Sequence, residues 1–152
     1  MSEGEEEMKK KINKETKKYK AKELRKLRNK CLKLWSEAVK CRAGYKCEWS
    51  GETEHLNSHH IEGYRTNANL RYDVRNGLCV TAGHHKFKAE SADNSFCFIF
   101  SLMWKKRKED LKYLLKVWRE PVREVTKEFL EEKIKELSGY LITGKGYKDI
   151  SS

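Results

Sequence analysis

The first quarter of the chain carries apolar residues at the three- and four-residue steps of a helix. From Glu5 to Lys40 the sequence contains neither Gly nor Pro. The apolar positions that share one helical face in this stretch are Leu24, Leu27, Cys31, Leu34 and Ala38. This spacing predicts one long helix with a single buried stripe.

The N-terminal half of this predicted helix has a different character. Lys9–Lys22 consists mostly of Lys, Glu and small polar residues and has no apolar stripe. Such a stretch is expected to fray or to stay disordered in solution. A solvated charged face is the simplest interpretation, and an arm that contacts phosphates is the functional one.

After Ala43 the helical period ends, and glycines, a tryptophan and several histidines follow. Tyr45–Trp49 alternates as a strand does, Ser50–Thr53 resembles a turn, and Leu56–Ile61 could form the returning strand. The pattern therefore predicts a short hairpin formed by these two segments.

A polar loop and a short helix are expected after the hairpin. Residues Glu62–Val74 are polar, and Asn76-Gly77 is typical of a turn. Thr81–Ala89 can form a short helix in which Thr81 is the N-cap. The predicted order in this region is strand, strand, helix.

The C-terminal third is predicted to be helical. An apolar, aromatic stretch begins after Asn94, and helical spacing continues up to Pro121. A second helix is expected over Val122–Leu137, because proline is tolerated in a first helical turn but disrupts a helix interior. The tail beyond Gly139 is expected to end in disorder.

Composition limits the function classes. A chain of 152 residues has room for one compact domain with helical additions. The net charge of +11 and the pI near 9.4 favour polyanionic partners. No apolar run is long enough to span a bilayer and no signal peptide is recognisable, so we expect a cytoplasmic protein. The five cysteines are an odd, unevenly spaced set, which indicates reduced thiols.

Four of the five histidines form two adjacent pairs, His59-His60 and His84-His85, and an Asn-Gly turn lies between the pairs. Neighbours on a strand point to opposite faces, so one histidine of a pair can bind a metal while the other reaches the substrate. Phosphodiester hydrolysis needs a base that activates water and a cation that neutralises charge on the phosphate. A neutral imidazole and one divalent ion can meet both needs.

Four segments carry a resemblance to a known family. Lys46–Gly51, Ser58–Ile61, Asn76–Cys79 and His84-His85 together resemble the HNH, or ββα-metal, nucleases, over roughly residues 31 to 98. The helical segment before Arg42 is similar to the one that precedes the hairpin in phage-type members.

The resemblance implies an α+β fold with a small ββα-metal core flanked by N- and C-terminal helices. The expected division is a basic helical arm over residues 1–30, a nuclease core over 31–98, a helical extension over 99–139 and a flexible tail over 140–152.

The resemblance also implies a role for each site residue. His60 falls on the general base, and His59, which precedes it, on a metal ligand. Asn76 falls on the asparagine that fixes the loop joining strand to helix and so orients the base. A second metal ligand on the following helix falls on His85, with His84 as the alternative if the helix begins one residue earlier.

The expected cofactor is one divalent ion, Mg²⁺ or Mn²⁺, with Ni²⁺ and Zn²⁺ as alternatives. Many members of the family also hold a structural zinc with two Cys-x-x-Cys knuckles, but Ser50 stands here where the second cysteine of the first knuckle would be. Structural zinc is therefore not expected, and a site built from Cys41, Cys47, Cys79 and His84 would be needed to rescue it.

Arg65 and Arg71 lie in the loop before Asn76 and could bind the scissile phosphate or its flanking backbone. Together these features predict a metal-dependent DNA endonuclease. One metal and one base cut a single strand, so nicking is expected, and double-strand cleavage would require a homodimer or two visits. The alternative is a non-catalytic nucleic-acid-binding module with a structural metal.

Overall fold

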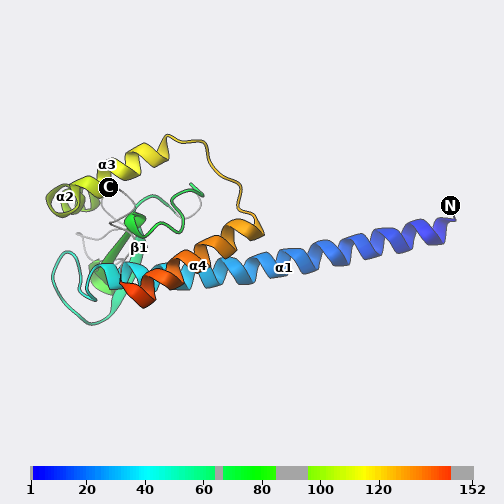
Figure 1. Ribbon diagram of the computed structural model, residues 1–152, viewed down its shortest axis with the longest axis horizontal. Helices are drawn as coiled ribbons and strands as arrows, with labels where there is room; N and C mark the ends of the chain where they lie inside the picture. Colours follow the sequence, from blue (N-terminus) through cyan, green and yellow to red (C-terminus); the bar gives the residue numbers. More distant parts are fainter. Residues whose placement is uncertain (1, 64–66, 85–95, 145–152) are drawn as a thin grey trace.

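The computed structural model describes residues 2–63, 67–84 and 96–144. The fold is α+β, with helices around a small antiparallel sheet of two strands (Figure 1). Its elements in chain order are α1 Glu3–Arg42, β1 Leu56–His60, the 3₁₀ turn η1 Val74–Asn76, β2 Gly77–Thr81, α2 Phe96–Lys106, α3 Lys108–Trp118 and α4 Lys127–Thr143.

The predicted long helix is confirmed as α1, which also continues through Lys9–Lys22, where fraying was expected. The C-terminal half of α1 packs against α4, and the two helices run in the same direction. Glu23 pairs with Lys127 at the start of α4, and the Cys31 thiol donates to the Leu130 carbonyl further along. The N-terminal half extends beyond α4 as a single exposed helix (Figure 1).

The predicted hairpin is wrong. β1 pairs with β2, in a register that places His60 opposite Gly77, and residues 45–49 are not a strand. They form a tight turn instead, because the Cys47 carbonyl accepts from Gly51 N at 2.8 Å and the Cys47 N–H donates to Glu52 O at 2.8 Å. Local hydrogen bonds thus use the backbone groups that a strand would offer to a neighbour.

The sheet lies between two apolar clusters. On one face Cys79 packs with α1 and α4, around Trp35 and Val39. On the other face Leu78 and Val80 pack with α2 and α3. The alternation of side chains along a strand explains this division of β2. All five residues of β2 are buried, so the strand is the centre of the fold.

α1 approaches the sheet so closely that only glycine fits at one position. A Cβ atom on Gly77 would lie 2.2 Å from Val39 Cγ2 and 3.0 Å from Trp35 Cζ2. Ser58 Oγ also donates to the Ser36 carbonyl at 2.8 Å, which ties β1 to the same helix. α1 is therefore both the long arm and the backing of the sheet.

The C-terminal helices differ from the predicted boundaries. The single helix expected before Pro121 is divided into α2 and α3 at Arg107, whose backbone is not helical and whose side chain enters the buried interior. The last helix begins at Lys127 instead of Val122, because the Thr126 side chain caps it by accepting from Phe129 N at 3.2 Å.

The region after β2 begins as predicted, although only its start is described. Residues 82–84 form a helical turn, and Thr81 Oγ1 accepts from His84 N at 3.3 Å, as an N-cap residue does. The remainder of the helix expected up to Ala89 lies outside the described residues. Of the tail expected to be flexible, residues 145–152 also lie outside them, whereas residues 140–143 belong to α4. None of the described helices is long and apolar enough to cross a membrane.

Candidate active site

His60 is the last residue of β1 and is held on two sides. Its imidazole stacks on the indole of Trp35, with ring centroids 3.7 Å apart and planes inclined by 8°. Its Nε2 lies 2.8 Å from the carbonyl oxygen of Arg71. A carbonyl can only accept, so this contact requires the proton on Nε2 and leaves the basic lone pair of the neutral ring on Nδ1.

The surroundings of His60 also favour the neutral ring. Burial lowers the pKa of this histidine below its ordinary value, and the nearby Arg71 charge lowers it further. The hydrogen bond to the Arg71 carbonyl acts in the opposite direction but is outweighed. A half-buried, oriented and neutral imidazole at physiological pH is suited to accept a proton from water.

Asn76 is fully buried and ties the loop between the two strands to the sheet. Its Nδ2 donates to the carbonyls of Glu62 at 2.9 Å and Leu70 at 3.0 Å, and its Oδ1 accepts from Glu62 N at 2.7 Å. Its carbonyl also accepts from Ile61 N at 3.0 Å. These bonds fix both ends of the loop that contributes the Arg71 carbonyl to His60.

His59 and His60 lie on opposite faces of β1. His60 faces α1, whereas His59 stands opposite Leu78, whose side chain belongs to the α2 and α3 side of the sheet. The two histidines therefore do not share one ligand position within the strand, as the sequence indicated.

His84 is buried, with 5% of its surface exposed. Its Nδ1 lies 2.8 Å from Thr81 Oγ1, and its ring is parallel to that of Phe98 with centroids 6.3 Å apart. His85, the preferred second metal ligand, lies outside the described residues, and so does Arg65. The structure thus gives the environment of the alternative ligand but not that of the preferred one.

Arg71 takes part in the site through its backbone as well as its charge. Its carbonyl oxygen holds His60, and its guanidinium is close enough to influence the pKa of that ring. Sequence reasoning assigned Arg71 only a phosphate-binding side chain. The backbone contact could not be predicted, because it depends on the path of the loop.

Among the described residues, the cysteines do not converge with other possible metal ligands. Cys47 Sγ accepts from Ser50 N at 3.4 Å, and such contacts lower the pKa of this thiol in spite of its burial. The Ser50 hydroxyl, which stands where a second cysteine would be, donates a hydrogen bond to the Glu52 carboxylate. Within residues 2–63, 67–84 and 96–144, no three His, Cys, Asp or Glu side chains converge on a metal position, and this includes Cys41, Cys47, Cys79 and His84.

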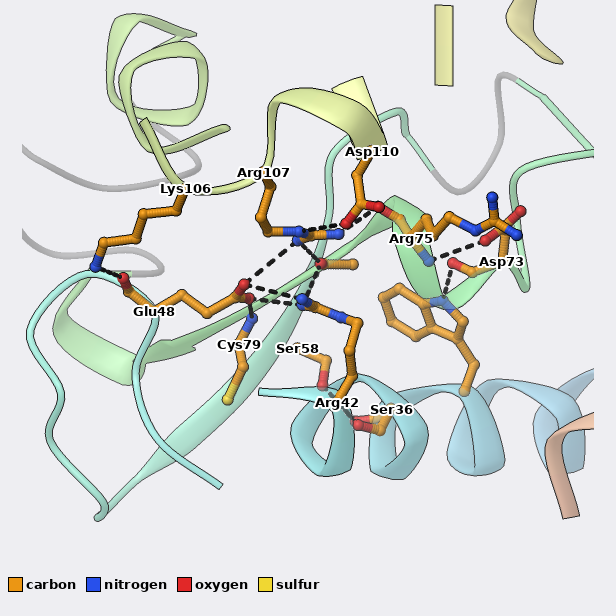
Figure 2. Close-up of polar contacts among 12 residues, drawn as sticks. Ser36, Arg42, Glu48, Ser58, Asp73, Arg75, Cys79, Lys106, Arg107 and Asp110 are labelled. Carbon is orange, nitrogen blue, oxygen red and sulfur yellow. Dashed lines mark hydrogen bonds and ion pairs between the residues drawn. The ribbon is translucent and has the colours of Figure 1, made fainter. Parts of the chain in front are cut away.

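A buried ionic cluster beside β2 was not anticipated from the sequence (Figure 2). Glu48 accepts from both Nη atoms of Arg42, at 3.0 and 2.7 Å, and lies 3.5 Å from Nη1 of Arg107. Both arginines also donate to the Gly77 carbonyl, at 3.0 and 2.6 Å. The cluster links the end of α1 and the start of α3 to the first residue of β2.

Glu48 also closes the outer edge of β2. Its N–H donates to the Cys79 carbonyl at 2.8 Å, and its carboxylate accepts from the Cys79 N–H at 2.7 Å. One residue therefore supplies both bonds that a third strand would make at this point. This contact explains how residues 45–49 lie beside the sheet without belonging to it.

A second buried carboxylate, that of Asp73, lies at the start of η1, whereas the ionic cluster contacts Gly77 at its end. Asp73 accepts from the Tyr113 hydroxyl at 2.6 Å and from Arg75 N at 2.9 Å, and its backbone carbonyl accepts from Trp35 Nε1 at 2.8 Å. Burial raises the pKa of Asp73. Trp35 thus contacts Asp73 at the edge of its ring and His60 on the face of its ring. Through these two contacts it links the imidazole of His60 to the loop between β1 and β2.

Comparisons with models of protein families, with curated proteins and with solved structures found no match to this chain. The candidate site accordingly depends on residue types, spacing and the geometry described above.

Proposed function

We propose that this protein is a metal-dependent DNA endonuclease of the HNH, or ββα-metal, type. The observation that carries the proposal is the setting of His60, an oriented and neutral imidazole at the end of a strand. Support also comes from Asn76, whose three side-chain hydrogen bonds fix the loop between β1 and β2, the loop that holds the Arg71 carbonyl against His60. The corresponding asparagine of the family fixes a different loop, the one that joins strand to helix.

In the proposed reaction, His60 Nδ1 takes a proton from a water molecule, and the water oxygen attacks phosphorus. The bond from phosphorus to the 3′ oxygen breaks, and this oxygen leaves with a proton from solvent. The hydrogen bond from Nε2 to the Arg71 carbonyl keeps the ring in the tautomer that this step needs. The indole of Trp35 covers one face of the ring and so helps to fix its orientation.

His59 and His85 are the residues that would hold a divalent ion, with Mg²⁺ and Mn²⁺ preferred. Such an ion would supply the positive charge that phosphoryl oxygens and the leaving 3′ oxygen require. The orientation of His59 away from His60 fits a division between a ligand and a base. The burial of His84, which leaves 5% of its surface exposed, favours His85 as the helix ligand.

DNA is the proposed substrate because the chain carries a net charge of +11. Arg71 and Arg65, in the loop beside the base, are proposed to bind the phosphate backbone. With one base and one metal position in each chain, a monomer nicks one strand. A homodimer would be required to cut both strands in one binding event.

The test is cleavage of supercoiled plasmid by the wild type and by His60→Ala, each with EDTA, Mg²⁺, Mn²⁺, Ni²⁺ or Zn²⁺. We expect metal-dependent conversion to the nicked circle by the wild type and a loss of about 100-fold or more in His60→Ala. DNA binding, measured in EDTA, should be retained by the variant.

His55→Asn is the matched control. His55 is exposed and has a positive φ of 53°, a conformation that asparagine tolerates and alanine does not. This variant should nick plasmid at the wild-type rate. If no metal supports nicking while DNA binding is intact, the enzyme proposal fails and a nucleic-acid-binding module remains.

A further inference from the structure

The exposed half of α1 carries an ordered row of positive charge. Five basic residues follow one another at steps of three and four, the spacing that aligns side chains along one helical face. The row consists of Lys11, Lys14, Lys18, Lys22 and Arg25. All five are exposed, and none of them forms a salt bridge within the part of the chain that the structure describes.

The row lies away from the surface that α1 uses for packing. Leu24, Leu27 and Cys31 pack against α4 and the core. At about 100° per residue, this packing face is centred more than a third of a turn from the row. The row is therefore open to a large partner while the helix remains docked on α4.

The same three- and four-residue spacing continues along α1 from the row to the candidate active site. From Arg25 it continues through Asn29 and Lys33, both exposed, to Ser36. The Ser36 carbonyl accepts from Ser58 Oγ at 2.8 Å, and Ser58 is the residue before His59 on β1. The row therefore ends beside the face of β1 that carries Ser58 and His60, the face that packs against α1.

From this alignment we infer that α1 is a guide for duplex DNA, which binds the phosphate backbone along the row and leads the duplex to β1. The inference rests on the proposed function for its choice of substrate. It adds that binding is independent of sequence on this side, and that the enzyme needs a longer flank of duplex on one side of the cut than on the other.

Charge complementarity favours a polyanion over other partners. Between Lys9 and Lys33 the only acidic residues are Glu15 and Glu23, and Glu23 is paired with Lys127. A membrane-surface helix would need a wide apolar face. The large apolar side chains exposed on this part of α1 are only Met8, Ile12 and Tyr19, among the residues described.

The length of the row sets the size of the flank. Lys11 and Ser36 are separated by about 38 Å at 1.5 Å per residue. This distance corresponds to about 11 base pairs of duplex at 3.4 Å each. Shortening the duplex below this length on the α1 side should weaken binding, whereas shortening the opposite flank should not.

The first test compares two charge-matched triple variants of the full chain. The row variant is Lys11→Gln, Lys14→Gln, Lys18→Gln. The control variant is Lys17→Gln, Lys20→Gln, Lys30→Gln, whose positions lie about 100° or more from the centre of the row. Gln and Lys have similar helix propensities, so both variants should keep the wild-type circular dichroism spectrum.

Binding of each protein to a fluorescent 30-base-pair duplex of arbitrary sequence is measured in EDTA over a series of salt concentrations. Loss of three phosphate contacts should reduce the slope of log K against log salt by about 2 to 3 in the row variant. The control variant should keep a slope close to the wild-type value. Equal losses in the two variants would show that only net charge matters and would overturn the inference.

Vesicles containing phosphatidylserine provide the competing surface. Binding of wild type to these vesicles but not to duplex, lost in the row variant, would replace the inferred DNA guide with a membrane contact. If duplex binding follows the row but no metal supports nicking, the guide stands and the endonuclease proposal fails. If nicking occurs and the row variant keeps the wild-type salt slope, the guide alone fails.

A second test uses linear duplexes with one preferred nick position and flanks shortened from either end. Wild type should lose about tenfold or more in nicking rate when one flank falls below about 11 base pairs, and should tolerate shortening of the other. The row variant should lose this asymmetry. Symmetrical dependence on both flanks in the wild type would contradict the guide.

Discussion

The indole ring of Trp35 lies face to face with the imidazole of His60, with ring centroids 3.7 Å apart. Trp35 belongs to α1 and His60 to β1, so the contact joins the long helix to the candidate base. Trp35 is itself fixed by the hydrogen bond from its Nε1 to the Asp73 carbonyl at 2.8 Å. The protonation of His60 therefore depends on how α1 packs against the sheet.

The first prediction concerns the pKa of His60. Because burial lowers this pKa below 6.5, NMR titration of the ring should give a value below that of a free histidine, and Trp35→Leu should raise it. The folded state binds its proton less readily than the unfolded chain does. The contribution of His60 to the free energy of unfolding is therefore fully present above about pH 6.5 and is lost as the pH decreases through the folded-state pKa.

Nicking should fall over the same acidic range, because only the neutral ring accepts a proton. His60→Gln should remove this histidine's contribution to the pH dependence of the free energy of unfolding. A measured pKa at or above 6.5 in the wild type would contradict the described burial of the ring.

The second prediction concerns Asn76. Asn76→Ala removes three buried side-chain hydrogen bonds to Glu62 and Leu70 and should lower the free energy of unfolding by about 2 to 4 kcal/mol. Nicking should fall further than stability alone explains, because the loop that holds His60 is released. Urea unfolding and plasmid nicking measure the two effects.

Asn76→Asp keeps the side-chain oxygen that accepts a hydrogen bond and removes the Nδ2 group that donates two, so it tests the two functions separately. The introduced carboxylate can still accept from Glu62 N but would face two carbonyl oxygens, so its cost should decrease as the pH is lowered and the carboxyl becomes protonated. Asn29→Ala, on the exposed surface of α1, should change stability by less than about 0.5 kcal/mol. Similar effects from both alanine variants would refute the role given to Asn76.

The third prediction concerns the buried ionic cluster. Glu48→Gln leaves Arg42 and Arg107 without their shared carboxylate and should cost about 3 to 5 kcal/mol in thermal or urea unfolding. Lys112→Met breaks an exposed ion pair with Glu109 and should cost between 0 and about 1 kcal/mol. A loss of less than 1 kcal/mol in Glu48→Gln would mean that the cluster does not hold β2 in place.

The fourth prediction concerns the close approach of α1 to β2. Gly77→Ala places a methyl group within 2.2 Å of Val39 Cγ2, so the helix must move or the strand must shift. We expect a loss of about 3 kcal/mol, together with a lower nicking rate, because His60 is paired with Gly77 and stacked on the same helix.

Adding Val39→Ala should recover part of this loss, since it removes the two nearest methyl groups. Gly139→Ala, which has open space around its Cβ position within α4, should stabilise the protein by about 0.5 to 1 kcal/mol. If Gly77→Ala is as stable as the wild type, the approach of the helix is looser than the structure describes.

Local sequence determined the features that depend on local physics. The apolar spacing from Leu24 to Ala38 determined the long helix and its buried stripe, because helical hydrogen bonds join residues only four apart. The same is true of the positive row on α1 and of the adjacent histidines, whose opposite orientations follow from strand geometry alone.

Only the tertiary structure decided which strand pairs with β1 and what surrounds the candidate base. The partner of His60 is Gly77, at the far end of a long loop, and the alternation in Tyr45–Trp49 suggested a nearer strand. Such pairings depend on the closure of a loop and on the packing of both faces, which no local pattern records. Trp35 became part of the site for the same reason, because its apolar ring is removed from water against His60 and the core only when helix and sheet meet.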